Sequence, residues 1–269
     1  MKLSIITINY NNKDGLQRTI DGVLSQTWKD WEWLIVDGGS TDGSKELIEK
    51  YQEYLTYWCS EKDGGIYNAQ NKGTSLAKGE YLSYLNSGDT YCSPDTLQQV
   101  FANHLTEDIV YGNWNIVSEG ECKHIQSSPR AMTLHKLIDY NICHQAMFIR
   151  RDFKSKYAYD ESYKVLADWK CWLQGVLANC TYRYIPVTVC DFDGVGVSNA
   201  SNPRCMEDYQ KLCEEFSSIR KLNDELKKYS EDNIILDIYD LMHHNVFCLN
   251  IIHLVSRILQ LLMGIKPRC

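Results

Sequence analysis

The sequence predicts an α/β protein with a mostly parallel central sheet flanked by helices. Two observations support this prediction. Over the first hundred residues, short apolar runs alternate with segments of helical periodicity, and polar residues follow each run directly. Strand and helix alternating at this spacing is typical of parallel sheets with crossover helices. With 269 residues, the chain is long enough for one large domain or two small ones.

The individual elements follow in order along this first part. The runs LSIITI at 3–8, EWLIVD at 32–37 and YLSYLN at 81–86 predict buried strands. Helices are expected after the first and second runs, where apolar residues recur at helical spacing (Leu16, Ile20, Val23, Leu24; Leu47, Ile48, Tyr51, Leu55). A further helix is expected at 93–101, with Ser93 as its N-cap and Pro94 as its first residue.

The later part of the chain is more mixed. Strands are expected at 108–117, 145–151 and 181–192, with a helix at 162–179. From about Pro203 the pattern is helical to the end, with a break near Ser230. We therefore expect a catalytic or binding domain at 1–202 and a helical C-terminal extension at 203–269.

Composition excludes several classes of protein. A net charge of -7 argues against a general nucleic-acid binder, which would carry a basic stripe. The 11 cysteines form no Cys-x-x-Cys pair, so they are expected to be reduced and to pack as small hydrophobes. The N-terminus shows no secretory signal, and no apolar run is long enough to span a membrane. We expect a cytoplasmic protein.

Two glycine-containing loops follow predicted strands and suit a nucleotide. In VDGGSTDGS, Asp37 could accept hydrogen bonds from a base or ribose while the glycines let the ligand approach. A plain strand-to-helix loop, with Ser40 or Thr41 capping the next helix, is the alternative. In EKDGGIYNAQNKG, two acidic residues precede a Gly-Gly turn and a helix that carries Asn68 and Asn71. The usual dinucleotide and P-loop fingerprints are absent.

The segment SYLNSGDTY at 83–91 ends a predicted strand with Asp89 beside a glycine. A carboxylate at the end of a parallel strand suits Mg²⁺ or Mn²⁺, which commonly take one or two protein carboxylates plus phosphate oxygens. A simple Gly-Asp turn is the commoner outcome for such a segment. The short motif alone does not decide between the two.

Taken together, these segments resemble the nucleotide-binding half of family 2 glycosyltransferases, which are inverting enzymes of the GT-A fold. The resemblance rests on LSIITINYNN, GVLSQTWKDWEWLIVDGGSTDGS, DGGIYNAQNKG and GEYLSYLNSGD in this order. It continues more thinly through HQAMFIRR, ADWKCWL and GVGVSN. It implies a nucleotide-binding half at 1–90 and an acceptor half at 91–202.

The resemblance implies roles for particular residues. Tyr10 matches the aromatic residue that lies against the base, and Asp37 the aspartate that hydrogen-bonds the uracil or ribose. Asp63 matches an acidic residue in the loop that closes on the nucleoside, and we group Asn71 with these donor-binding residues. Asp89 matches the metal ligand of the motif.

The catalytic base of the family is matched by Asp168, in ADWKCWL, where it begins a predicted helix. Alternatively, Asp168 serves only as a negative charge that stabilises the N-terminus of the helix. His144 and Gln145 precede a predicted strand and could line the acceptor side. His144 could equally be a core residue.

The resemblance also implies an activity. It indicates transfer of one sugar from a nucleotide sugar, expected to be UDP-linked, to a glycan or lipid-linked glycan of the bacterial cell surface. The metal motif is reduced, because Asn86 and Gly88 stand where relatives often carry aspartates, and the processive Gln-x-x-Arg-Trp motif is absent. A nucleotidyltransferase and a non-catalytic sugar-nucleotide-binding protein remain as alternatives.

The C-terminal segment at 241–269 has no acidic side chain and is rich in Leu and Ile. One interpretation is an amphipathic helix on an anionic membrane, which would place the enzyme at the inner face and near a polyprenyl-linked acceptor. Packing onto the catalytic domain or onto a partner subunit is the alternative.

Overall fold

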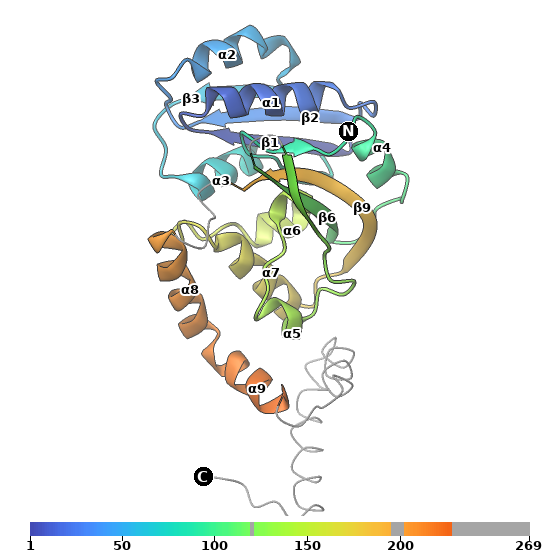
Figure 1. Ribbon diagram of the computed structural model, residues 1–269, viewed down its shortest axis with the longest axis vertical. Coiled ribbons are helices and arrows are strands. Elements are labelled where there is room, and N and C mark those ends of the chain that lie inside the picture. Colours follow the sequence, from blue (N-terminus) through green and yellow to red (C-terminus); the bar gives the residue numbers. More distant parts are fainter. Residues whose placement is uncertain (119–120, 195–201, 228–269) are drawn as a thin grey trace, which may run out of the picture.

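The computed structural model describes residues 1–118, 121–194 and 202–227 (Figure 1). Its centre is a nine-stranded sheet with the order β3-β2-β1-β4-β8-β6-β9-β5, and β7 pairs with β6 outside this path. The strands are β1 (Leu3–Asn9), β2 (Trp31–Asp37), β3 (Tyr57–Ser60), β4 (Tyr81–Tyr84), β5 (Thr90–Tyr91), β6 (Ile109–Ser118), β7 (Glu121–Gln126), β8 (Met147–Arg150) and β9 (Tyr182–Asp193).

The first half of the sheet is parallel, as predicted. β1 pairs with β2 and β4, and β2 pairs with β3, all in parallel register. Helices α1 (Lys13–Leu24) and α2 (Ser44–Lys50) lie on one face, and α3 (Ile66–Leu76) lies on the other (Figure 1). Because both faces are covered, all seven residues of β1 are buried. The carboxyl ends of β1, β2 and β4 therefore meet at one edge.

The second half of the sheet changes direction at β8. This strand runs antiparallel to both of its neighbours, β4 and β6. The beginning of β8, including the 3₁₀ turn His144–Ala146, therefore reaches the edge where β4 ends. The helices of this half are α4 (Thr96–Phe101), α5 (Leu134–Leu137), α6 (Arg151–Lys156) and α7 (Ala167–Leu177).

Several predicted helix starts are wrong. The helix expected from Ser162 begins at Ala167, because the backbone N–H groups of the preceding residues donate to the Asp208 carboxylate instead. The helix expected from Ser93 begins at Thr96, and its N-cap position is occupied by Asp95.

The cap predicted for the second helix is also wrong. Gly43, in the left-handed region, occupies the N-cap position of α2, while the hydroxyl of Ser40 donates to Asp37. In addition, the second helix is shorter than expected. It ends at Lys50, and Leu55, which was expected to lie on its apolar face, adopts an extended backbone conformation.

Helices α8 (Pro203–Glu215) and α9 (Ser217–Lys227) follow the sheet and extend away from the nucleotide-side strands (Figure 1). The helical pattern predicted from Pro203 is confirmed for these residues. The predicted break near Ser230 and the segment 241–269 lie outside the described residues, and the domain boundary at 202 stays a prediction. Within the described part of the chain, no helix is both long and apolar enough to cross a bilayer.

Candidate active site

Asp37 ends β2 and is completely buried. One carboxylate oxygen accepts hydrogen bonds from Asn9 Nδ2 at 2.7 Å and from the Ser40 hydroxyl at 2.5 Å. The other accepts from the Ser40 backbone N–H at 2.9 Å and from the Ser60 hydroxyl at 2.6 Å. Burial raises the pKa of Asp37, but the hydrogen bonds from Ser40, Ser60 and Asn9 outweigh it and leave the pKa below its usual value.

Tyr10 and Asp63 both lie close to Gly38, just after the end of β2. A Cβ atom added at Gly38 would lie 3.0 Å from Asp63 Oδ2 and 3.2 Å from Tyr10 Cδ2. Because Gly38 has no side chain, an aromatic ring and a carboxylate can both approach the backbone at this position. Tyr10 is 67% exposed, so its ring is available to a ligand. The structure thus brings these two predicted residues together, and their contact with a nucleotide stays a prediction.

Asn71 lies on α3 and is used within the protein. Its amide nitrogen donates to the Tyr159 carbonyl at 2.8 Å and to Glu161 Oε1 at 3.0 Å. Its amide oxygen accepts from the Tyr159 N–H at 3.0 Å. Both ends of the side chain therefore hold the segment between α6 and α7, and the predicted contact with the donor stays a prediction.

Asp89 returns to the same edge of the sheet after the turn that follows β4. Its carboxylate is 3% exposed and accepts two hydrogen bonds, from Gln145 Nε2 at 2.8 Å and from the Asp193 N–H at 2.9 Å. Burial raises the pKa of Asp89 to about 6, although these two donors and the nearby His144 act in the opposite direction. An ionised Asp89 would therefore be stabilised by a further positive charge.

The turn before Asp89 is shaped by Gly88 and fastened to α1. Gly88 has a φ of 107°, in the left-handed region that favours glycine. The Thr19 hydroxyl accepts from the Gly88 N–H at 3.0 Å and donates to the Asp89 carbonyl at 2.8 Å. Gly88 is therefore required by the turn, which explains why this motif position carries no acidic side chain.

Asp193, at the end of β9, supplies a second carboxylate near Asp89 that the sequence interpretation missed. A Cβ at Gly88 would lie 3.1 Å from Asp193 Oδ2, and the same oxygen is 3.0 Å from Arg18 Nη2. The rule that ligands bind at strand ends would have found it, since Asp193 directly follows the predicted strand at 181–192. Across the described residues, no group of three or more His, Cys, Asp or Glu could hold a metal ion.

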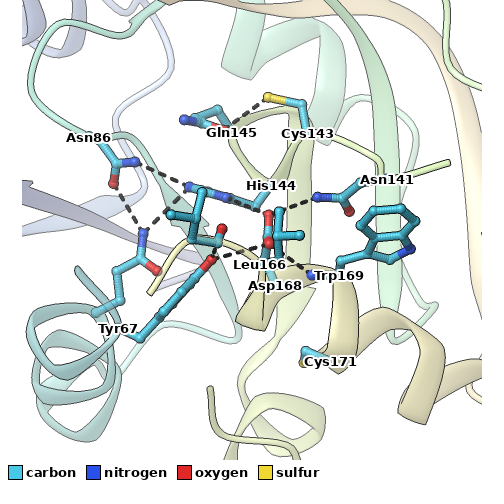
Figure 2. A network of polar contacts seen from close by, with 12 residues as sticks. Tyr67, Asn86, Asn141, Cys143, His144, Gln145, Leu166, Asp168, Trp169 and Cys171 are labelled. Atoms are coloured by element: carbon cyan, nitrogen blue, oxygen red, sulfur yellow. Dashed lines mark hydrogen bonds and ion pairs between the residues drawn. The ribbon is translucent and has the colours of Figure 1, made fainter. Parts of the chain in front are cut away.

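Asp168 lies in the first turn of α7 and is 5% exposed. Oδ1 accepts from the Trp169 N–H at 2.8 Å and from the Tyr67 hydroxyl at 3.2 Å. Oδ2 lies 3.3 Å from Asn141 Nδ2 and 3.1 Å from His144 Nδ1 (Figure 2). Burial, and then the charge of Asp168, raise the pKa of Tyr67 well above its usual value, so this hydroxyl stays protonated as a donor.

His144 connects Asp168 to the metal motif. Its Nε2 atom lies 3.3 Å from Asn86 Nδ2 and 3.4 Å from Gln70 Nε2, and Figure 2 shows the ring between Asn86 and Asp168. Both amide nitrogens are donors, so Nε2 accepts and Nδ1 carries the proton donated to Asp168. A continuous chain of side chains therefore joins Asn86, three residues before Asp89 in the motif, to the predicted base.

The comparison with known families decides which chemistry this arrangement serves. The profile described as glycosyl transferase family 2 matches residues 4–155, more than half of the chain. The chain belongs to glycosyl transferase family 2. This family 2 glycosyltransferase is 33% identical over 205 residues to the PGL/p-HBAD biosynthesis glycosyltransferase of Mycobacterium bovis. The alignment covers 72% of this chain and 77% of that relative. It is 29% identical over 236 residues to an uncharacterized glycosyltransferase of Mycobacterium tuberculosis, covering 84% and 85%.

Two solved structures with the same fold are complexes with nucleotide sugars. TarS of S. aureus, in complex with UDP-GlcNAc, aligns with a TM-score of 0.58 at 18% identity, over 72% of the chain. The mannosyltransferase PcManGT of Pyrobaculum calidifontis, in complex with GDP-Man and Mn²⁺, aligns with a TM-score of 0.55 at 18% identity, over 75% of the chain. The alignment spans 58% of the length of each of these two proteins. The GT-A fold predicted from the sequence is confirmed.

Proposed function

We propose that this glycosyltransferase moves a single sugar from a UDP-sugar to a hydroxyl group of a glycan or lipid-linked glycan, with inversion at the anomeric carbon. The observation that carries the proposal is the buried Asp168 carboxylate, which accepts from Trp169, Asn141 and His144 and is connected through His144 to the motif that contains Asp89. The single proton of the Tyr67 hydroxyl is shared with the closer Val165 carbonyl, which leaves room at Oδ1 for a hydrogen bond from the acceptor hydroxyl. Two similar proteins support the proposal, since TarS was solved with UDP-GlcNAc and the Mycobacterium bovis relative is a PGL/p-HBAD biosynthesis glycosyltransferase.

In the proposed reaction, Asp168 takes the proton from the acceptor hydroxyl. The acceptor oxygen forms a bond to the anomeric carbon while the bond from that carbon to the diphosphate oxygen breaks, and the nucleoside diphosphate leaves with the electron pair. Attack from the face opposite the leaving group inverts the configuration. His144, Tyr67 and Asn141 hold the carboxylate in one orientation, which limits the reorganisation needed before proton transfer.

The donor is proposed to lie along the edge formed by β1, β2 and β4. The Tyr10 ring would lie against the base, and Asp63, which is close to Tyr10 at Gly38, would accept a hydrogen bond from the nucleoside. Because all four hydrogen-bonding directions of Asp37 are taken by protein donors, this residue would act on the nucleoside through the Ser60 hydroxyl that it orients.

The residues at Asp89 fit a divalent cation that is bound together with the nucleotide. Asp89 lies close to a second carboxylate, Asp193, which is paired with Arg18, and Mg²⁺ or Mn²⁺ commonly takes one or two carboxylates, with phosphate and water completing its ligands. When bound, such an ion would offset charge that develops on the departing diphosphate. We propose that Asp89 is the principal ligand and that the cation binds weakly without nucleotide.

Asp168→Asn tests the proposal. A panel of nucleotide sugars, with and without Mn²⁺ or Mg²⁺, first identifies the donor by its protection against thermal unfolding. In the variant, transfer should fall roughly 10²–10⁴-fold because the general base is lost, while UDP affinity should remain nearly unchanged. Unchanged turnover would remove Asp168 from the mechanism, and an anomeric product of retained configuration would contradict inversion.

A further inference from the structure

A cavity of about 420 Å³ opens beside Asp168, between β6, β9, α7 and α8. We propose that this cavity is the acceptor site and that it selects a neutral acceptor with an apolar ring or aglycone. The inference rests on the proposed function, since it assigns the cavity to the molecule whose hydroxyl Asp168 deprotonates. Most of its wall comes from residues beyond position 155, where the family profile ends.

The cavity has one polar end and apolar walls. Asp168 and His144 lie at the polar end, where a hydroxyl group would be placed next to the base. The walls are formed largely by aromatic and aliphatic side chains from β6, β9, α7 and α8 (Trp114, Ile116, Phe192, Trp169, Met206, Tyr209). A ring that points its hydroxyl at Asp168 would thus bury its faces against aromatic surfaces.

The charge of the lining restricts the class of acceptor. None of the described residues that line the cavity is a lysine or an arginine. A phosphate or diphosphate held between the apolar walls would therefore be removed from water without a counter-charge from the lining, which is unfavourable. The moiety next to the base is accordingly neutral, and any charged group of a longer acceptor would lie outside the cavity.

The α8 wall is fixed to the helix that carries the base. Asp208 Oδ2 accepts from the backbone N–H groups of Lys164 at 2.7 Å, Val165 at 2.6 Å and Leu166 at 3.0 Å, directly before α7. Seven residues farther along α8, Glu215 lies 2.7 Å from Lys170 Nζ on α7. The cavity is therefore a preformed site, because its two sides are joined by charged and hydrogen-bonded contacts.

The test measures acceptor binding without any donor, by saturation-transfer NMR and titration with simple probes. The probes are phenyl and methyl glycosides of the same sugars, with the corresponding sugar 1-phosphates. We expect the phenyl glycosides to bind at least about tenfold more tightly than the methyl glycosides, because the phenyl ring buries more apolar surface, and the 1-phosphates not to bind in the cavity.

Met206→Glu places a carboxylate at the cavity and should weaken phenyl glycoside binding about tenfold or more. Ile125→Glu is the matched control, because Met206 is 55% exposed and Ile125 is 61% exposed but lies outside the cavity lining. UDP affinity should not change in either variant. Equal affinity for phenyl and methyl glycosides, or equal weakening by both substitutions, would overturn the assignment.

Failure of the proposed function would be distinguishable. Phenyl glycoside binding that responds to Met206→Glu in a protein that never cleaves a nucleotide sugar would support the cavity and contradict the proposed reaction. Donor cleavage together with glycoside binding that ignores Met206→Glu would support the reaction and overturn the cavity assignment.

Discussion

Asp37 and Asp89 occupy comparable places but differ in their hydrogen bonds. Each follows a parallel strand at the same edge of the sheet, and their exposed fractions are 0% and 3%. Asp37 accepts four hydrogen bonds and has a lowered pKa, whereas Asp89 accepts two and has a pKa raised to about 6. Burial alone therefore does not determine the ionisation of a carboxyl group; the supply of donors does.

The contrast suggests different uses for the two carboxylates. Asp37 has its full set of donors without any ligand, so it stabilises the loop and orients two serine hydroxyls. Asp89 has only two donors, so a bound cation would stabilise its ionised form. A substitution that removes the negative charge should affect chiefly folding at Asp37 and chiefly activity at Asp89.

The largest effect is expected from Asp89→Asn on sugar transfer. Loss of the principal carboxylate should lower the transfer rate by roughly 10³-fold or more, because the charge on the departing diphosphate is no longer offset. UDP titrations with and without Mn²⁺ should show that the metal no longer strengthens binding. An Asp89→Asn enzyme that still responds to Mn²⁺ with wild-type affinity would place the cation elsewhere.

Asp37→Asn should chiefly reduce stability. The amide nitrogen would face groups that all donate, so the free energy of unfolding should fall by about 2 kcal/mol in urea titrations. Asp42→Asn is the matched control, since Asp42 accepts from Lys13 and Ser44 in the same loop but is exposed. If the two variants lose equal stability, the buried hydrogen bonds of Asp37 contribute no more to stability than the exposed ones of Asp42.

The pH dependence of the Asp37 contribution has a definite sign. Its folded-state pKa lies below the unfolded value of about 3.9, so the stabilisation is present above that value and is lost as pH falls through the folded pKa. Asp37→Asn should therefore have a flatter stability profile below about pH 4 than the wild type.

Asp89→Asn should have the opposite effect on the metal-free protein. The raised pKa means that stability is fully present below the unfolded value of about 3.9 and is lost as pH rises through about 6. With a chelator present, the wild type should lose roughly 2–3 kcal/mol of stability relative to the variant between pH 4 and pH 7.5, because the folded-state pKa lies about 2 above the unfolded value. A variant destabilised as much as Asp37→Asn would remove the contrast between the two sites.

The smallest effect is expected from Gly38→Ala. The added Cβ would press on Asp63 and Tyr10 and should weaken UDP binding about tenfold, with little change in stability. Gly22→Ala is the control, because its Cβ would also be tightly placed, 3.2 Å from Thr90, but away from Tyr10 and Asp63. Unchanged UDP affinity in Gly38→Ala would show that the nucleoside does not bind beside Gly38.

Much of the nucleotide half could be predicted from sequence because its rules are local. Buried apolar runs predicted β1, β2 and β4, and the strand-end rule singled out Asp37 and Asp89. The donors around these residues could not be predicted, since Ser60 and Asp193 reach them from distant strands. The pattern of the loop could not show that Ser40 bonds to Asp37 rather than to the helix.

The acceptor side was harder to predict for a topological reason. β8 is antiparallel to its neighbours, so His144 and Gln145 reach the site from just before the start of a strand. The strand-end rule considers only residues that follow a strand. The start of α7 depends on Asp208, more than forty residues later in the chain. The helical pattern beginning at Ser162 carried no sign of that contact.

The three N–H groups gathered by Asp208 also bear on how the enzyme is synthesised. Until residue 208 has left the ribosome, the backbone of Val165 and Leu166 has no acceptor in its folded position, and the turn that sets Asp168 cannot be completed. The nucleotide half, by contrast, can close its parallel strands more than a hundred residues earlier. A growing chain could therefore bind its donor before its base is in place, so catalytic competence would be among the last properties it acquires.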